Sequence, residues 1–180
     1  MMEELKGRDF FLVPYAMVNG AYTVPDEMIK LIYRKIEEEG SFNKVFLSGL
    51  ITDADKFIKY LRLDENIPVF AFFNDKSPAG FAWMNNISGC RCQGHFCYLR
   101  KAWGDKCVEI SEKILDYWFS LKSGDTHVFD TVVGIVPTQN KFAIKHKENL
   151  GMTKVGVIPD YYSNLMTGKK FDALISYIRR

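Results

Sequence analysis

The sequence has few of the residues that mark specialised classes of protein. Of its 180 residues, three are histidine, six are proline and four are cysteine. No apolar run approaches the roughly 20 residues that a membrane-spanning helix needs. Lysine and arginine number 24 against 22 aspartate and glutamate, which leaves a formal net charge of +2. That balance is too small to indicate a nucleic-acid binder by itself, and we expect neither nucleic acid nor membrane as a partner.

The remaining composition is that of an ordinary globular protein. The chain is 47% hydrophobic and 26% charged, which excludes disorder as its main state. No linker rich in proline, glycine and serine divides it, so we expect one domain over residues 1–180. The charged segment of residues 1–8, which includes Glu3 and Glu4, has no signal-peptide core. We therefore expect a cytoplasmic protein whose four cysteines are free thiols.

Apolar segments bounded by turn residues predict the strands of this chain. They are residues 9–13, 67–73, 80–87, 92–99, 127–136, 153–158 and 171–178. The run over residues 127–136 is nearly continuously apolar, which is typical of a strand covered on both faces.

Helical periodicity and capping residues predict the helices. One follows Pro25 and ends before Gly40; a second begins at a capping box of Thr52 and Asp55. A third begins at Gly104 with a stripe of apolar residues, and a fourth runs from Pro137 to Gly151. The order is β-α-α-β-β-β-α-β-α-β-β, which predicts a mixed α/β sheet with helices packed on it.

One segment within this order carries a recognisable pattern. Residues 96–106 read FCYLRKAWGDK, in which Phe96, Lys101 and Gly104 have the spacing of an acetyl-CoA motif. That motif has an apolar strand residue, then Arg or Gln five positions on, then a glycine at a helix start. The chain resembles the GNAT superfamily of N-acetyltransferases. Lys106 departs from the family, which usually has Gly or Ala at that place.

A second stretch adds to the resemblance. Asn140, Ala143, Gly151 and Met152 have the spacing of the family's Asn-x-x-Ala and Gly-Phe residues. Lys147 stands where the family usually has a tyrosine. The resemblance implies a twisted, mostly antiparallel sheet of about seven strands flanked by about four helices.

The resemblance also implies acetyl-CoA as cosubstrate and an acceptor amine on a small molecule or a protein. A helix N-terminus with a glycine at the preceding turn suits the pyrophosphate, and the fourth strand would hold the thioester. The implied cofactor-binding residues are Phe96, Cys97, Tyr98, Leu99, Lys101, Ala102, Trp103, Gly104, Asp105, Lys106 and Asn140.

The candidate catalytic residues are His95 and Asp130 as bases and Lys147 as an acid. His146 is about 100° away from Lys147 around the helix, so we expect it to point elsewhere. Tyrosines in loops would line the acceptor side. They are Tyr15, before the first helix, with Tyr161 and Tyr162, after the sixth strand.

Three alternatives remain beside this interpretation. The cysteines at 90, 92, 97 and 107 surround His95, but their spacing lacks the paired knuckles of a structural zinc site, and we expect no metal. Basic residues near the C-terminus lack a stacking motif for nucleic acid and favour a solvated face. A non-catalytic GNAT-like binding or assembly protein, such as a phage or mobile element would encode, is the main rival. The sequence leaves the acceptor and the oligomeric state open, a homodimer included.

Overall fold

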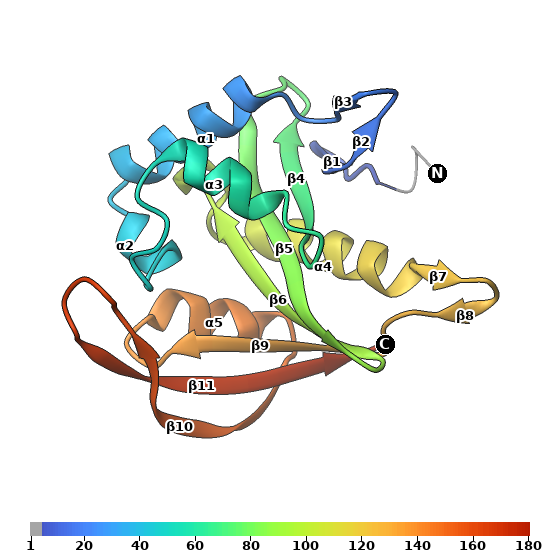
Figure 1. The fold of residues 1–180 in the computed structure, drawn as a ribbon. Helices are drawn as coiled ribbons and strands as arrows, with labels where there is room; N and C mark the ends of the chain where they lie inside the picture. Colours follow the sequence, from blue (N-terminus) through green and yellow to red (C-terminus); the bar gives the residue numbers. More distant parts are fainter. Residues whose placement is uncertain (1–4) are drawn as a thin grey trace.

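The structure is a computed structural model, which describes residues 5–180; Glu3 and Glu4 lie outside the described residues. A seven-stranded sheet forms its centre, in the order β1-β4-β5-β6-β9-β11-β10 (Figure 1). The strands are β1 (Phe10–Pro14), β4 (Ile67–Phe73), β5 (Pro78–Ser88), β6 (Arg91–Tyr98), β9 (Thr131–Pro137), β11 (Lys170–Arg179) and β10 (Thr153–Ser163). Neighbouring strands pair antiparallel except β6 and β9, which are parallel. The predicted sheet, mixed and mostly antiparallel, is confirmed.

Helices cover both faces of this sheet (Figure 1). They are α1 (Asp26–Glu38), α2 (Phe42–Val45), α3 (Ala54–Leu61), α4 (Asp105–Ser120) and α5 (Lys141–Asn149). A short 3₁₀-helix, η1 (Arg100–Ala102), precedes α4. Two small hairpins complete the described chain: β2 (Met17–Val18) with β3 (Ala21–Tyr22), and β7 (Lys122–Ser123) with β8 (Thr126–His127).

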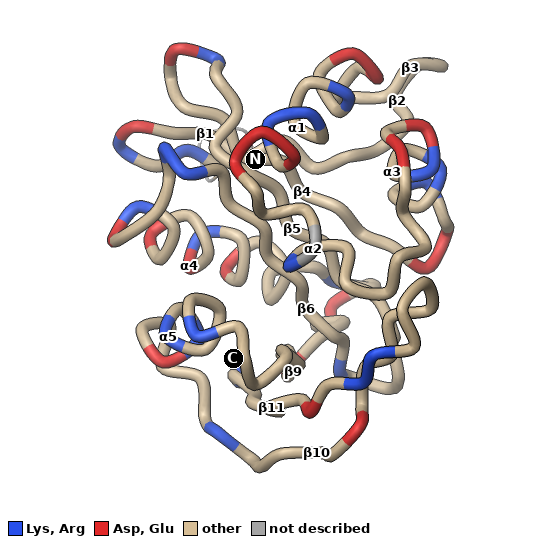
Figure 2. The backbone as a smooth tube through the Cα atoms, turned by 90° about the vertical axis from the view of Figure 1, so that its left-hand side faces the viewer, with Lys and Arg blue, Asp and Glu red and all other residues tan. Residues whose placement is uncertain are grey.

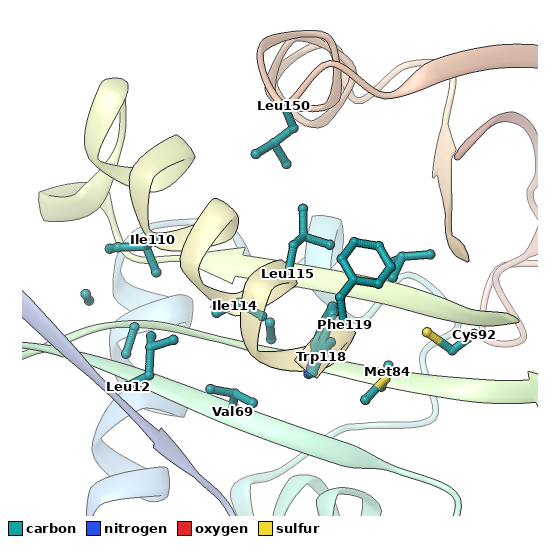
Figure 3. Close-up of a cluster of buried hydrophobic side chains, with 14 of the residues drawn as sticks. Leu12, Val69, Met84, Cys92, Ile110, Ile114, Leu115, Trp118, Phe119 and Leu150 are labelled. Atoms are coloured by element: carbon teal, nitrogen blue, oxygen red, sulfur yellow. The ribbon is translucent and has the colours of Figure 1, made fainter. Parts of the chain in front are cut away.

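The alternation of side chains along β4 and β5 creates two separate cores. Phe70 and Phe81 face α1 and α3, whereas Val69 and Met84 face α4. Figure 3 shows the second core, where Trp118 and Ile114 of α4 lie over these strands and Leu115 points toward Leu150. The large aromatic residues on one face and the small aliphatic ones on the other fix which helix covers which side.

Several sequence-based boundaries were wrong. The N-cap of α3 is Asp53, whose carboxylate accepts the Lys56 N–H at 2.8 Å, and not Thr52. The apolar run at 127–136 is broken, because His127 belongs to the β7–β8 hairpin and β9 begins at Thr131. Strand β10 extends to Ser163, so Tyr161 and Tyr162 lie on a strand and not in a loop.

The expectation that this strand is covered on both faces was also wrong. Val132 and Gly134 are buried, but Ile135, Val136 and Pro137 are partly exposed. These three residues line a cavity, so this end of β9 faces open space where packing was expected.

Candidate active site

Strands β6 and β9 run parallel for a short distance and then separate (Figure 1). Their paired residues are Arg91–Gln93 on β6 and Thr131–Val133 on β9. Both strands continue past this point, β6 to Tyr98 and β9 to Pro137, without pairing to each other. Backbone N–H and C=O groups along the facing edges are therefore available to a ligand.

A glycine follows the last paired residue on each strand. A β-carbon on Gly94 would lie 2.7 Å from Cγ1 of Val132, and one on Gly134 would lie 2.5 Å from Nζ of Lys147. Both distances are far below ordinary van der Waals contact. The point of divergence thus depends on two residues without side chains.

A cavity of about 690 Å³ occupies the space between the separated strands. Its walls are β6, the end of β9, the N-terminus of α4, one side of α5 and the α2 segment, together with Tyr60, Trp83 and Tyr162. A volume of this size accommodates an extended small molecule with much of its surface buried.

One end of the cavity reaches the N-terminus of α4. Gly104 is the N-cap of this helix and has a φ of 82°, a conformation that favours glycine. The first N–H groups of a helix lack intrahelical partners, and they lie at the positive end of the helix dipole. Trp103 and Phe142 stack across this end, with ring centroids 5.7 Å apart. The indole of Trp103 is fixed by a 3.0 Å hydrogen bond to the carbonyl of Tyr98.

The two lysines of the predicted motif lie in ion pairs outside the cavity lining. Nζ of Lys101 is 3.0 Å from Asp75, and Nζ of Lys106 is 3.1 Å from Asp9 and 2.7 Å from Glu109. Their neighbours Ala102 and Asp105 do not line the cavity either.

Other cations stand beside the cavity instead. Lys44 of α2 lies over the ring of Phe142 at 5.5 Å, and Lys145 of α5 also lines the cavity. Sequence reasoning missed Lys44 because α2 is only four residues long and has no periodic signal.

The predicted strand residues are in part where the resemblance implied. Phe96, Cys97 and Tyr98 line the cavity, whereas Leu99 is buried and its N–H bonds to Ala79. Asn140 lines the cavity and also caps α5, since its Oδ1 accepts the Ala143 N–H at 3.2 Å.

Lys147 is buried with 7% of its surface exposed. Among the residues that the structure describes, its Nζ has no hydrogen-bond partner. Loss of hydration lowers the pKa of this amine from 10.5 to about 7. The side chain therefore exchanges a proton near neutral pH at the point where β6 and β9 separate.

His146 also lines the cavity, contrary to the expectation that it points elsewhere. Its Nε2 is 2.9 Å from the Ser111 hydroxyl, and its Nδ1 is 3.4 Å from Sγ of Cys107. The Ser111 hydroxyl is in turn 2.5 Å from that of Tyr98. Burial, with a smaller contribution from Lys147, lowers the pKa of His146 to about 4.

His95 of β6 also lines the cavity. Its ring stacks on Trp83 with centroids 4.5 Å apart and 5° between the planes. Its Nε2 lies 3.0 Å from Oδ1 of Asn85, and the hydroxyl of Tyr60 receives hydrogen bonds from both Trp83 and Asn85. Burial and then Lys147 lower the pKa of His95 to about 4, so its imidazole is neutral at physiological pH.

The remaining candidates are separated from this group. Asp130 precedes β9, does not line the cavity and pairs with Arg180 at 3.2 Å. Tyr15 is packed between Tyr22 and Phe70, and its hydroxyl accepts from Arg62. Tyr161 is exposed on β10.

Tyr162 does line the cavity. Its hydroxyl donates to the carbonyl of Ile135 at 2.9 Å, which ties β10 to β9 at the cavity wall.

Lys and Arg positions are interspersed with Asp and Glu positions along the helices and turns (Figure 2). Of the basic residues near the C-terminus, Lys147 is buried, and Lys145, Lys170 and Arg180 each lie within 4.0 Å of a carboxylate. Over residues 5–180, no three His, Cys, Asp or Glu side chains form a metal-binding group, and no helix could cross a membrane.

Solved structures with the same architecture are numerous although their sequences are distant. A probable GNAT-family acetyltransferase from Chromobacterium violaceum superposes with a TM-score of 0.75 at 12% identity, covering 97% of this chain and 85% of that one. The chain has the GNAT fold. No protein-family model and no curated protein matches the sequence.

Two further GNAT-fold structures contain ligands. The microcin C7 self-immunity acetyltransferase, solved with acetyl-CoA and AMP, has a TM-score of 0.69 at 16% identity over 97% of this chain and 94% of that one. The spermidine N-acetyltransferase of Vibrio cholerae, solved with CoA and spermine, has a TM-score of 0.69 at 13% identity over 93% and 95%.

Proposed function

We propose that this protein is an N-acetyltransferase that moves an acetyl group from acetyl-CoA to a primary amine by direct attack. One observation carries the proposal: β6 and β9 separate around a cavity that extends to the N-terminus of α4. That cavity offers unpaired backbone groups for a thioester arm and helix N–H groups for a pyrophosphate. The ligands of the two GNAT-fold structures above support the choice of cosubstrate.

The residues around α4 fit the phosphate end of acetyl-CoA. Gly104 begins the helix without a side chain in the way, and Lys44 and Lys145 supply cations beside the cavity. In this proposal they take the part that the sequence assigned to Lys101 and Lys106, which do not line the cavity. The backbone of β6 from Phe96 to Tyr98 would hold the pantetheine arm and polarise the thioester carbonyl.

Lys147 would move the proton. The attacking amine forms a bond to the carbonyl carbon, the carbon–sulfur bond breaks, and a proton passes from the amine to the departing thiolate. A side chain with a pKa of about 7 accepts a proton as the free amine and donates it as the ammonium ion. His95, with a pKa of about 4, is too weak a base for this step; as a neutral ring it donates its Nε2–H to Oδ1 of Asn85. Asp130 has no part in the proposal.

Calorimetry with acetyl-CoA, alongside CoA release with a panel of amines, tests the function. Gly104→Glu places a carboxylate at the phosphate end and should abolish binding. Gly20→Glu is the matched control, because Gly20 has a nearly identical φ of 83° with equally open surroundings, in the remote β2–β3 hairpin. Unchanged affinity in Gly104→Glu would contradict the site.

A non-catalytic binding protein is the second candidate. It is favoured by Lys147, which replaces the expected tyrosine and keeps its Nζ buried. Such a protein would bind acetyl-CoA and release no CoA with any amine.

A further inference from the structure

The hydroxyl of Tyr60 accepts two hydrogen bonds from its neighbours and so keeps its own hydrogen for another acceptor. Two donors point at its oxygen, Nε1 of Trp83 and Nδ2 of Asn85, each at 3.2 Å. Both lone pairs of the phenol are thus occupied, and its O–H must donate elsewhere. Burial raises the pKa of Tyr60, so the hydroxyl keeps this hydrogen at neutral pH. Because Tyr60 lines the cavity, the hydrogen is available to a bound molecule.

Asn85 fixes the complementary group on His95. Since its Nδ2 donates to Tyr60, its Oδ1 is the atom that meets Nε2 of His95 at 3.0 Å. Oδ1 is an acceptor, so Nε2 carries the proton of the neutral ring and Nδ1 keeps its lone pair. Stacking on Trp83 holds the ring in this orientation.

The cavity wall therefore presents one hydrogen-bond donor, the Tyr60 hydroxyl, and one hydrogen-bond acceptor, Nδ1 of His95. The side-chain amide of Asn85 orients both. Asn85 itself is 8% exposed, so these hydrogen bonds belong to the buried interior of the protein. Both residues line the cavity, so a ligand that satisfies both groups has an N–H for His95 and an oxygen for Tyr60.

We propose that Tyr60 and His95, oriented by Asn85, select an α-amino carbonyl compound as the acceptor, such as an amino-acid amide or a peptide N-terminus. His95 Nδ1 accepts from the amine, and the Tyr60 hydroxyl donates to the adjacent carbonyl. This inference rests on the proposed acetyltransferase function and names its substrate class.

The protonation chemistry of the acceptor agrees with this class. An α-amino group has a pKa of about 8, whereas an alkylamine such as the side chain of lysine is near 10.4. More of the α-amine is uncharged at neutral pH, which suits a site whose histidine is a weak base. Among the cavity-lining residues of the described chain there is no carboxylate that would hold a polyamine.

Two amines of the same shape test the proposal. Alaninamide carries the carbonyl, and 1,2-dimethylpropylamine replaces its carboxamide with an isopropyl group. Tyr60→Phe should lower kcat/KM for alaninamide about tenfold more than kcat/KM for the alkylamine, the effect of one lost hydrogen bond to the carbonyl. Tyr162→Phe is the matched control: its hydroxyl is already bonded to Ile135, so its loss should affect both amines alike.

Asn85→Asp tests the positioning role without changing the size of the side chain. A carboxylate accepts from both neighbours, so the Tyr60 hydroxyl would turn toward it and away from the ligand. We expect the preference for alaninamide to fall to the level of Tyr60→Phe, with the affinity for acetyl-CoA unchanged.

The outcomes separate this inference from the function on which it rests. Acetylation of both amines, with Tyr60→Phe lowering both equally or neither, would overturn the selection of a carbonyl and leave the acetyltransferase intact. Binding of acetyl-CoA without CoA release from any amine of the panel would overturn the function and, with it, this inference. CoA release with another amine of the panel but not with alaninamide would overturn this inference alone.

Discussion

Nζ of Lys147 occupies the place that a side chain on Gly134 would take, 2.5 Å from the position of its β-carbon. The glycine of β9 thus makes room for the lysine of α5 at the point where the central strands separate. A buried amine without a hydrogen-bond partner lowers the free energy of unfolding. Because this amine lies at the cavity, we infer that it is retained for function.

Replacing Lys147 with Met should therefore stabilise the protein. The variant keeps a long flexible side chain and removes the amine, so we expect the free energy of unfolding at neutral pH to rise by about 1 to 3 kcal/mol. The pKa is about 7 in the folded chain and 10.5 ordinarily, so the unfolded chain binds more protons between these values. Wild-type stability then rises with pH through that window. Urea unfolding should show the advantage of the variant shrinking at about pH 9.

The same substitution should remove activity. Loss of a proton-transferring side chain typically lowers kcat by about 10² to 10⁴, and we expect acetyl-CoA affinity to stay the same. Lys141→Met, exposed on the same helix and outside the cavity lining, controls for the change of residue type and should leave both stability and kcat nearly unchanged. A less stable Lys147→Met variant would show that the amine has a partner.

Acid should destabilise the protein through His95 and His146. Both have a folded pKa of about 4 against an ordinary value of 6.5, so the unfolded chain takes up protons first as the pH falls. Their contribution is complete above about pH 6.5 and is lost toward pH 4, at most about 1.4 kcal/mol per pH unit for each ring. Unfolding titrations of His95→Gln and His146→Gln should each flatten this slope; an unchanged slope in both would contradict the prediction.

Periodicity was sufficient to predict the central sheet and the four longer helices, because apolar spacing reports directly on which face is buried. It failed over residues 127–136, where one apolar run contains both the end of the β7–β8 hairpin and the start of β9. Asp130 was placed on the strand for that reason. The motif indicated Gly104 and the β6 residues.

The network of Tyr60, Asn85 and His95 could not be predicted from the sequence. Its members meet only because β5 pairs with β6 and α3 packs against these strands. His146 was set aside on helical register alone. The cavity is wide enough that side chains about 100° apart on α5 both reach it.

Ser111 links α4 to the cavity wall through two short contacts. Its hydroxyl is fully buried between Tyr98 and His146, at 2.5 and 2.9 Å. Ser111→Ala leaves both partners without this hydrogen bond and should lower the free energy of unfolding by about 1 to 3 kcal/mol. Thermal unfolding measures the effect. Ser120→Ala on the exposed end of the same helix is the control and should cost less than about 0.5 kcal/mol. Equal losses in the two variants would contradict a specific contribution from the buried network, because alanine has the higher helix propensity at both positions.

Gly94 should be essential for the geometry of the strand separation. A β-carbon there would lie 2.7 Å from Cγ1 of Val132 and 3.2 Å from Cζ3 of Trp118, two fully buried side chains. Valine is β-branched and stiff, so β6 itself must move to admit a methyl group. We expect Gly94→Ala to lose about 1 to 3 kcal/mol of stability and to weaken acetyl-CoA binding.

The control for Gly94→Ala is Gly156→Ala on β10, where nothing lies within 4 Å of the added carbon and where stability and binding should be unchanged. Denaturant unfolding and calorimetry on the two variants decide the matter. If Gly94→Ala kept full affinity for acetyl-CoA despite lost stability, the separation of β6 from β9 would not be the feature that holds the cosubstrate. The proposed function would then lose the observation that carries it.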